Sequence, residues 1–229
     1  MATNGNISGG GGLGGGRKPC IASFIDHGTI ESHRYYLARQ TIFEMLSDRG
    51  YGVPDSELSR SLTEFRSVFG DKPNLERLRI SASLRSNPSK KILVIFCGTD
   101  EIRKQVIVGI FSQITNKESL HRVILILQSK MNSHARKVVD DFQIKVETFQ
   151  ITDLLVNITK HVLAPKHEIL SSEEKRKLLK EYHVEDKQLP RMLENDAIAR
   201  YYGLEKGQVV KITHSGALTD SLVTYRCFM

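Results

Sequence analysis

KKILVIFC, at residues 90–97, is typical of a buried β-strand, because an uninterrupted apolar run follows two lysines. VILIL, at residues 123–127, has the same character. Both runs are far shorter than the roughly 20 apolar residues that a membrane helix needs. Residues 77–83 and 143–149 alternate between polar and apolar side chains and predict two further strands. The first 150 residues are therefore expected to contain a β-sheet.

The segments around these strands have the apolar spacing of helices. Helices are predicted over residues 31–49, in one continuous stretch between Pro54 and Gly70, over residues 100–114, and after Asn132. The expected buried face of the third helix consists of Ile102, Val106 and Ile110. Strands that alternate with helices predict an α/β domain with a mostly parallel or mixed sheet.

The last 80 or so residues have a different pattern. Ser171 and Glu174 form a capping box that starts a helix running through Tyr182. A second helix is expected from Asp196 to Tyr202, ended by Gly203, and strands are expected over 208–212 and 222–228. This pattern predicts a compact α+β domain, too small for a deep active site.

Together these elements predict two domains behind a tail. Residues 1–19 hold eight glycines and almost no apolar side chains, so they are expected to form a flexible Gly-rich tail. The tail has no strand before it and no Gly-Lys-Ser/Thr end, which argues against a phosphate-binding loop. The first domain is expected at residues 29–150 and the second at residues 156–229.

Composition restricts the class of protein. Apolar residues make up 40% and charged residues 26% of 229 residues, which is ordinary for a folded, non-membrane chain. The N-terminus has no charged and apolar leader, and three scattered cysteines make no disulfide framework, so a reducing compartment is expected. The net charge of +7 is concentrated in residues 76–137, where twelve basic and four acidic residues give +8. A polyanionic partner and a solvated basic face both fit that excess.

No catalytic constellation is apparent. Asp140, Asp141 and Glu147 are the local carboxylates that a metal-dependent nuclease would use, but no strand motif with a lysine accompanies them. His161 and His167 have no third ligand at a useful spacing, so backbone hydrogen bonding in a loop explains them better than a zinc site. No nucleophile elbow is present. We therefore expect no enzyme activity, cofactor, metal or small-molecule ligand.

The C-terminal motifs resemble one family, the fifth subunit of eukaryotic nuclear RNA polymerases, whose C-terminal half on its own is similar to a small subunit of the archaeal polymerase. The motifs that carry the resemblance are VNITKH (156–161), PKH (165–167), QLPR (188–191), YGL (202–204) and GQVVKI (207–212). The resemblance extends more loosely from about residue 31 through DRGY (48–51) and the strand pattern. It implies a non-catalytic nuclear subunit that binds no membrane. Its N-terminal domain would form part of the jaw around downstream double-stranded DNA, and its C-terminal domain would bind the largest subunit near the sixth subunit.

The resemblance also implies two functional surfaces. In the family a Thr-Pro-Ser-Ala loop lies on the DNA side of the jaw, and NSHA (132–135) takes its place here. The residues expected to face DNA are Lys130, Asn132, Ser133, Arg136 and Lys137. An alternative is that Asn132 caps a solvated basic helix. The residues expected to form the polymerase-assembly surface are His161, Pro165, Lys166, His167, Gln188, Leu189, Pro190, Arg191, Gly203, Gly207, Lys211, Tyr225 and Arg226.

Between residues 213 and 222 the chain departs from the subunit shared by polymerases I, II and III. Charged and aromatic positions of that subunit are replaced, and loss of their ion pairs would suit a different largest subunit. The residues expected to govern partner choice are His214, Ala217, Leu218, Ser221 and Leu222. The chain resembles the plant branch of the family that serves RNA polymerase V in RNA-directed DNA methylation, in this segment and also through its N-terminal extension, ESHRYYLAR (31–39) and ITDLL (151–155). A divergent common subunit and a free basic DNA-binding protein remain alternatives.

Overall fold

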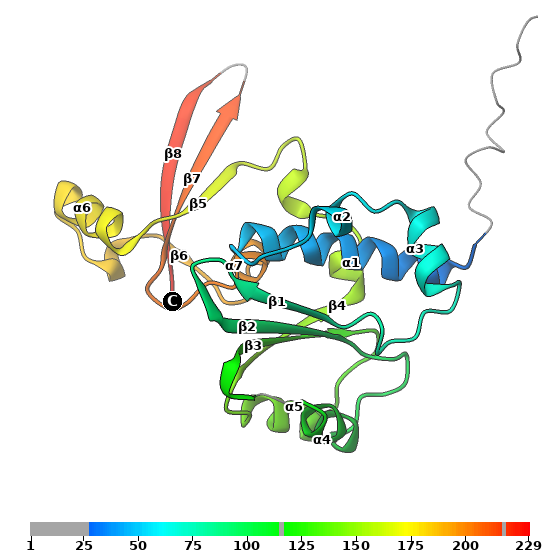
Figure 1. Ribbon diagram of the computed structural model, residues 1–229. Helices are drawn as coiled ribbons and strands as arrows, with labels where there is room; N and C mark the ends of the chain where they lie inside the picture. Colours follow the sequence, from blue (N-terminus) through cyan, green and yellow to red (C-terminus); the bar gives the residue numbers. More distant parts are fainter. Residues whose placement is uncertain (1–27, 115–116, 217–218) are drawn as a thin grey trace, which may run out of the picture.

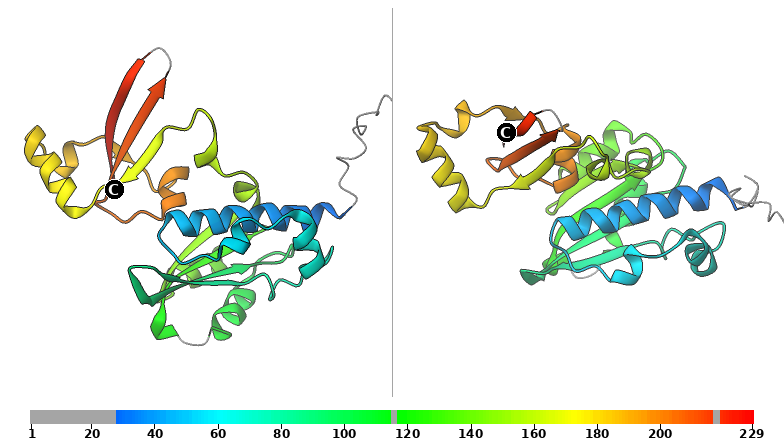
Figure 2. Two further views of the ribbon diagram at one scale, coloured as in Figure 1. Left: turned by 45° about the horizontal axis from the view of Figure 1, so that its top comes forward. Right: turned by 90° about the horizontal axis from the view of Figure 1, so that it is seen from above.

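The computed structural model describes residues 28–114, 117–216 and 219–229. The predicted tail at 1–19 lies outside these residues. Two domains, each built on a four-stranded sheet, make up the described chain (Figure 1). The C-terminal domain lies at the end of the N-terminal domain where its long first helix, α1 (Ile30–Asp48), finishes (Figure 2). No helix in the described residues is both long and apolar enough to cross a membrane.

The N-terminal domain is an α/β sandwich around a mixed sheet. Strand order is β1-β2-β3-β4; β1 is antiparallel to β2, and β2, β3 and β4 are parallel. Helix α1 covers one face of the sheet and α4 and α5 cover the other (Figure 1). The elements are α2 (Asp55–Leu58), α3 (Leu62–Phe69), β1 (Ile80–Leu84), β2 (Asn87–Phe96), α4 (Lys104–Ser112), the 3₁₀ turn η2 (Lys117–Ser119), β3 (Leu120–Leu127), α5 (Ser133–Asp140) and β4 (Lys145–Gln150).

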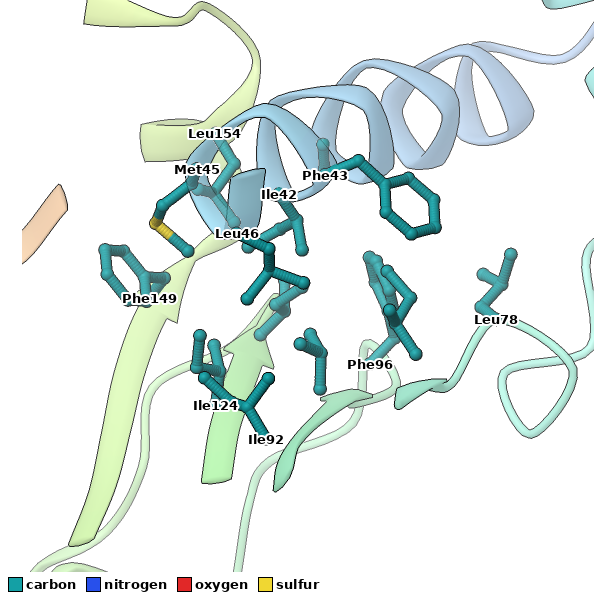
Figure 3. Close-up of a cluster of buried hydrophobic side chains, with 14 of the residues drawn as sticks. Ile42, Phe43, Met45, Leu46, Leu78, Ile92, Phe96, Ile124, Phe149 and Leu154 are labelled. Carbon is teal, nitrogen blue, oxygen red and sulfur yellow. The ribbon is translucent and has the colours of Figure 1, made fainter. Parts of the chain in front are cut away.

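The predicted strand runs form the centre of this domain. Alternate side chains of β2 and β3 enter two separate apolar clusters, one on each face of the sheet. In Figure 3, Ile42 and Leu46 of α1 point toward Ile92 and Ile124 on the strands, and Met45 lies beside Phe149 of β4. Because both faces are covered by helices, the central strands have near-continuous apolar sequences.

Two predictions in this domain are wrong in detail. The single helix expected between Pro54 and Gly70 is two helices, because Ser61 and Glu64 form a capping box that starts α3 after a break. Helix α4 begins at Lys104 and buries Ile107 and Phe111, while Val106 is exposed. Ile102 precedes the helix and forms a parallel bridge with Met131, so it is not part of the helical face.

The C-terminal domain is a second sheet with strand order β5-β7-β8-β6. The capping box at Ser171 is confirmed, as is the final helix between its cap Asp196 and Gly203, where φ is +61°. The closing hairpin is longer than its predicted strands. The turn η3 (Ile151–Leu154) follows β4 and packs in the apolar cluster beneath α1 of the N-terminal domain. The elements of the C-terminal domain are η4 (Ile158–Lys160), β5 (Lys166–Ile169), α6 (Ser172–Tyr182), η5 (Asp186–Gln188), β6 (Arg191–Met192), α7 (Ala197–Tyr202), β7 (Val209–Gly216) and β8 (Thr219–Phe228).

Candidate functional site

A basic surface surrounds the start of α5. Lys130, Ser133, Arg136 and Lys137 are exposed, and the three cations form no ion pair with any described residue. The helix turns its apolar side toward the sheet, so its charged side chains point outward. The structure therefore brings together, around one helix start, the residues predicted to face DNA.

Asn132 has a structural role within this surface. Its Oδ1 accepts a hydrogen bond from the Ala135 amide at 2.7 Å and thereby caps α5. Its own amide donates to the Ile102 oxygen at 3.2 Å, which fixes the loop against the segment before α4. The side-chain oxygen of Asn132 is thus already used within the fold, while Ser133 is exposed to solvent.

A cluster of ion pairs joins the two domains, and sequence reasoning missed it. Glu147 on β4 lies between two guanidinium groups: Arg49 Nη2 is 2.7 Å from Oε2, and Arg122 Nη1 is 2.7 Å from Oε1. Both arginines also donate to the carboxyl end of α7. Arg49 binds the Arg200 and Tyr201 oxygens at 2.7 and 2.8 Å, and Arg122 binds the Gly203 oxygen at 2.7 Å. Cations at the carboxyl end of a helix interact favourably with its unpaired carbonyls.

Electrostatics explain why this buried group stays charged. Burial by itself raises the pKa of the Glu147 carboxyl, but Arg49 and Arg122 outweigh that effect and hold the pKa below its usual range. Burial likewise lowers the pKa of the Arg122 guanidinium, and the adjacent Glu147 carboxylate more than restores it. Glu147 is therefore a structural anion held by two cations. Asp140 and Asp141 lie in and after α5 and form no such contacts with the described residues.

A second set of polar contacts ties α1 to the C-terminal domain. Tyr201 Oη donates to the Asp48 carboxylate at 2.7 Å. Asn157, which is buried, donates from Nδ2 to Glu44 at 2.7 Å and to Tyr201 Oη at 3.1 Å. Asn157 belongs to the motif that carried the family resemblance, so that motif contributes to the contact between domains.

The predicted assembly residues divide into surface and packing positions. His161, Lys166, Gln188, Pro190, Arg191 and Arg226 are exposed. Leu189 packs against a buried cluster that contains Leu178 and Val209, and Gly203 lies under Arg122 at the contact between domains. The Gly207 amide donates to the Phe228 oxygen at 2.8 Å at a φ of +86°. Lys211 and Tyr225 lie directly opposite each other on the two strands of the β7–β8 hairpin.

A hollow of about 440 Å³ brings together four of the predicted residues. Its floor is apolar, and the walls come from the segment before β5, from β7, from β8 and from the start of α7. The predicted residues among its lining are Pro165, His167, His214 and Arg226. Val162 and Leu163 nearby in sequence are 96% and 83% exposed, so this domain leaves apolar surface uncovered. Two neighbouring apolar residues in a segment expected to be a loop are the sequence signal from which Val162 and Leu163 could have been predicted as exposed apolar surface.

The two histidines considered as metal ligands have other contacts. His161 Nδ1 accepts from the Leu163 amide at 3.2 Å, and His167 lies on β5 at the hollow. No cluster of three or more potential ligand side chains that could hold a metal ion occurs in the described part of the chain. Burial raises the pKa of the Cys97 thiol to about 11, which leaves it unreactive.

The partner-choice residues lie on the β7–β8 hairpin. His214 pairs with Leu222 across the two strands, and both side chains are exposed. Ser221 lies in β8. Ala217 and Leu218 fall outside the described residues.

Comparison with known families decides which family this architecture represents. The model of the RNA polymerase Rpb5 C-terminal domain matches residues 156–228, and that of the Rpb5 N-terminal domain matches residues 29–114. The chain belongs to the RNA polymerase Rpb5 family. Rpb5 is a non-catalytic subunit of RNA polymerase.

Similar Rpb5 proteins include subunits of specialised polymerases. The chain is 57% identical over 210 residues to DNA-directed RNA polymerase V subunit 5C of Arabidopsis thaliana, covering 92% of this chain and 90% of that relative. It is 48% identical to subunit 5B of RNA polymerases IV and V of the same plant, and that match covers 93% of this chain and 98% of the relative. The chain is 35% identical to the RPABC1 subunit of RNA polymerases I, II and III of Caenorhabditis briggsae, and the match covers 86% of this chain and 96% of that relative.

Proposed function

We propose that the chain is the Rpb5 subunit of a plant RNA polymerase V. The observation that carries this proposal is the identity of 57% and 50% with two polymerase V subunits of Arabidopsis thaliana, compared with 37% for another subunit 5-like protein of the same plant. All three matches cover most of the chain, so the difference is not due to a shorter match. In this role the chain is a nuclear subunit that supports RNA-directed DNA methylation and transcriptional silencing without catalysing nucleotide transfer.

The N-terminal domain would form part of the jaw around downstream DNA. Lys130, Arg136 and Lys137 are exposed, unpaired within the described residues, and grouped around the start of α5. Lysine and arginine side chains at such a place bind phosphate groups irrespective of base sequence. Ser133 adds an exposed hydroxyl beside them. Asn132 would act through the capped backbone rather than through a direct side-chain contact.

The C-terminal domain would bind the largest subunit and lie near the sixth. Exposed apolar side chains and the hollow that contains Pro165 and His167 support this part of the proposal, since assembly surfaces bury apolar area. The cluster around Glu147 would fix the jaw relative to this anchor, because Arg49 and Arg122 bind the carboxyl end of α7 directly. Movement of the anchor would then be transmitted to the DNA-facing surface.

The test is to identify the largest subunit that accompanies the tagged full chain in its own cells. Recovery of the polymerase V largest subunit is the expected result. Recovery of the largest subunits of polymerases I, II and III would make the chain a divergent common subunit. Recovery of DNA without any polymerase subunit would favour a free basic DNA-binding protein.

A further inference from the structure

A second hollow, of about 230 Å³, lies beside α4 in the N-terminal domain. Its lining includes Cys97, which is buried at the end of β2, and Ile102, which is buried just before the helix. Val106 of α4 also lines it and is 45% exposed. The hollow beside α4 therefore offers space and apolar surface to an incoming side chain.

The rim of this hollow is acidic within an otherwise basic part of the chain. Residues 76–137 contain twelve basic side chains and four acidic ones. Three of those four acidic side chains line the hollow, together with one guanidinium group: Glu76, Asp100, Glu101 and Arg79. Asp100 is exposed and forms no ion pair with any described residue. A segment that is both cationic and apolar would complement this surface.

The chain has such a segment just before its first described residue. Residues 17–25 read RKPCIASFI, which is two cations followed by a mostly apolar stretch. The described chain begins near the hollow, because Thr29 Oγ1 donates to the Asp71 oxygen at 2.6 Å and Leu75 belongs to the lining. The four residues from Asp71 to Leu75 span at most about 14 Å, whereas the eight residues from 21 to 28 span up to about 28 Å when extended. The segment is therefore long enough to reach the hollow.

Other exposed apolar side chains fit this segment less well. Val162, Leu163 and Leu222 belong to the C-terminal domain, at the opposite end of α1 from the start of the described chain (Figure 1). Helix α1 has 19 residues and is therefore about 28 Å long. Val68 lies nearer and is 43% exposed, but it is not part of the lining of the hollow beside α4. Reach and charge together favour that hollow.

We propose that residues 17–25 of this chain dock in the hollow beside α4. The Phe24 side chain fills the apolar space, and the Lys18 ammonium group meets the Asp100 carboxylate on the rim. The apolar contact supplies affinity and the ion pair sets the direction of the segment. This contact lies within one chain, so it does not depend on which polymerase the chain serves.

The docked segment would support the surface predicted to face DNA. Ser129 Oγ donates to the Asp100 oxygen at 2.6 Å, and the Asn132 amide donates to the Ile102 oxygen at 3.2 Å. Residues 100–102 therefore connect the hollow to the start of α5. A segment bound over them would hold this loop in place and reduce the opening of the Asn132 hydrogen bond.

Disulfide formation in the full chain tests the docking. Cys20 belongs to the segment, and Val106→Cys places a second thiol at the hollow. Val68→Cys is the matched control, because residue 68 is similarly exposed and Gly28 lies against Arg66 nearby, but outside the hollow. With oxidised glutathione, Cys20 is expected to bond to position 106 about tenfold faster than to position 68, because docking raises the effective concentration of the two thiols. Equal rates would overturn the proposal.

Substitutions of Phe24 in the Val106→Cys chain distinguish docking from random collision. Phe24→Asp places a charge in an apolar space, so disulfide formation is expected to fall to the rate of the control. Phe24→Leu keeps an apolar side chain and should stay within about twofold of the unsubstituted rate. An undiminished rate with Phe24→Asp would overturn the proposal. A disulfide between two chains in place of the intrachain bond would identify a second copy as the occupant and would also overturn it.

A charge exchange tests the ionic contact. Lys18→Glu is expected to slow disulfide formation at position 106 several-fold, and adding Asp100→Lys should restore it, because the pair is then re-formed with its signs reversed. Failure of the second substitution to restore the rate would overturn the contact between Lys18 and Asp100.

Hydrogen exchange tests the support of the loop without an added cysteine. The Asn132 amide is expected to exchange faster in Phe24→Asp than in wild type, whereas the Val210 amide, in the buried part of the other sheet, should be unchanged. Equal exchange at Asn132 in the two proteins would overturn the role of the segment in supporting this surface.

Discussion

Arg122, on the third strand of the N-terminal sheet, donates from Nη1 to the backbone oxygen of Gly203 at 2.7 Å, across 81 residues of sequence. The same nitrogen lies 2.7 Å from Glu147 Oε1. One guanidinium group therefore binds a carboxylate of its own domain and the end of the last helix of the other domain. This arrangement makes the relative position of the two domains depend on a few buried polar groups.

Gly203→Ala is expected to destabilise the chain by about 2 kcal/mol or more. A non-glycine residue at a φ of +61° is strained by about 1–2 kcal/mol. The new Cβ would also lie 2.7 Å from Arg122 Nη1 and 2.9 Å from Arg49 Cζ, and these groups cannot move freely because both are paired to Glu147. Urea unfolding of the two proteins measures the difference.

Gly109→Ala is the matched control for this substitution. Gly109 lies inside α4, and a Cβ there would meet no atom within 4 Å. Alanine should therefore stabilise the chain by about 0.5–1 kcal/mol through helix propensity. Equal effects of the two substitutions would contradict the packing described at Gly203.

Glu147→Gln is expected to cost about 3 kcal/mol at pH 7, because it leaves the buried Arg49 guanidinium without a carboxylate and leaves Arg122 with only the exposed Glu205 carboxylate. The cost should shrink as the pH falls. The pKa of the Glu147 carboxyl is lower in the folded chain than in the unfolded chain. Protons therefore bind the unfolded chain more readily, and the free energy of unfolding of wild type decreases as the pH falls from the unfolded pKa toward the folded one. The variant lacks this dependence. Unfolding free energies of both proteins at pH 7, 5 and 3 measure how the difference in stability between them decreases with pH.

Glu194→Gln provides the comparison for that experiment. Glu194 is exposed and forms no ion pair with any described residue, so its replacement should change stability by less than about 0.5 kcal/mol. A difference between wild type and Glu147→Gln that is constant from pH 7 to pH 3 would show that the carboxylate is not held ionised by Arg49 and Arg122.

Elements marked by local chemistry could be predicted from the sequence. The apolar runs around Val94 and Leu125 located two central strands, and the caps at Asn132, Ser171 and Asp196 located helix starts. The start of α3 was available too, since Ser61 and Glu64 have the spacing of a capping box. It was missed because the apolar stripe continued across the break.

The contact between domains had no comparable local signal. Arg49 and Glu147 are 98 residues apart, and each is an ordinary charged residue within its own segment. Only tertiary structure brings them together with Arg122. Likewise, nothing in the sequence of α4 distinguishes Val106 from Ile107, and the sheet decides which one is buried.

The buried cysteines are expected to resist thiol reagents in the folded protein. Burial raises the pKa of Cys97 to about 11 and also raises that of Cys227, so few molecules carry a thiolate at pH 8. In a Cys20→Ser background, an aromatic disulfide reagent should label neither thiol rapidly and should label both in denaturant. Val162→Cys in the same background is the control, because residue 162 is 96% exposed and should react at once. Rapid native labelling without that addition would contradict the burial of Cys97 and Cys227.

Neutralising Lys130, Arg136 and Lys137 together is expected to weaken the salt dependence of DNA retention by the assembled polymerase. Each lost phosphate contact should reduce the slope of log affinity against log salt by about 0.9, because fewer counterions are released. The loss should be similar for duplexes of different sequence, since these side chains would contact phosphates only. The control triple on α6 consists of Arg176, Lys177 and Lys180, which are exposed in the other domain. It makes the same change in net charge and should leave the slope intact. A slope unaffected by the first triple would remove the basis for placing DNA at the start of α5.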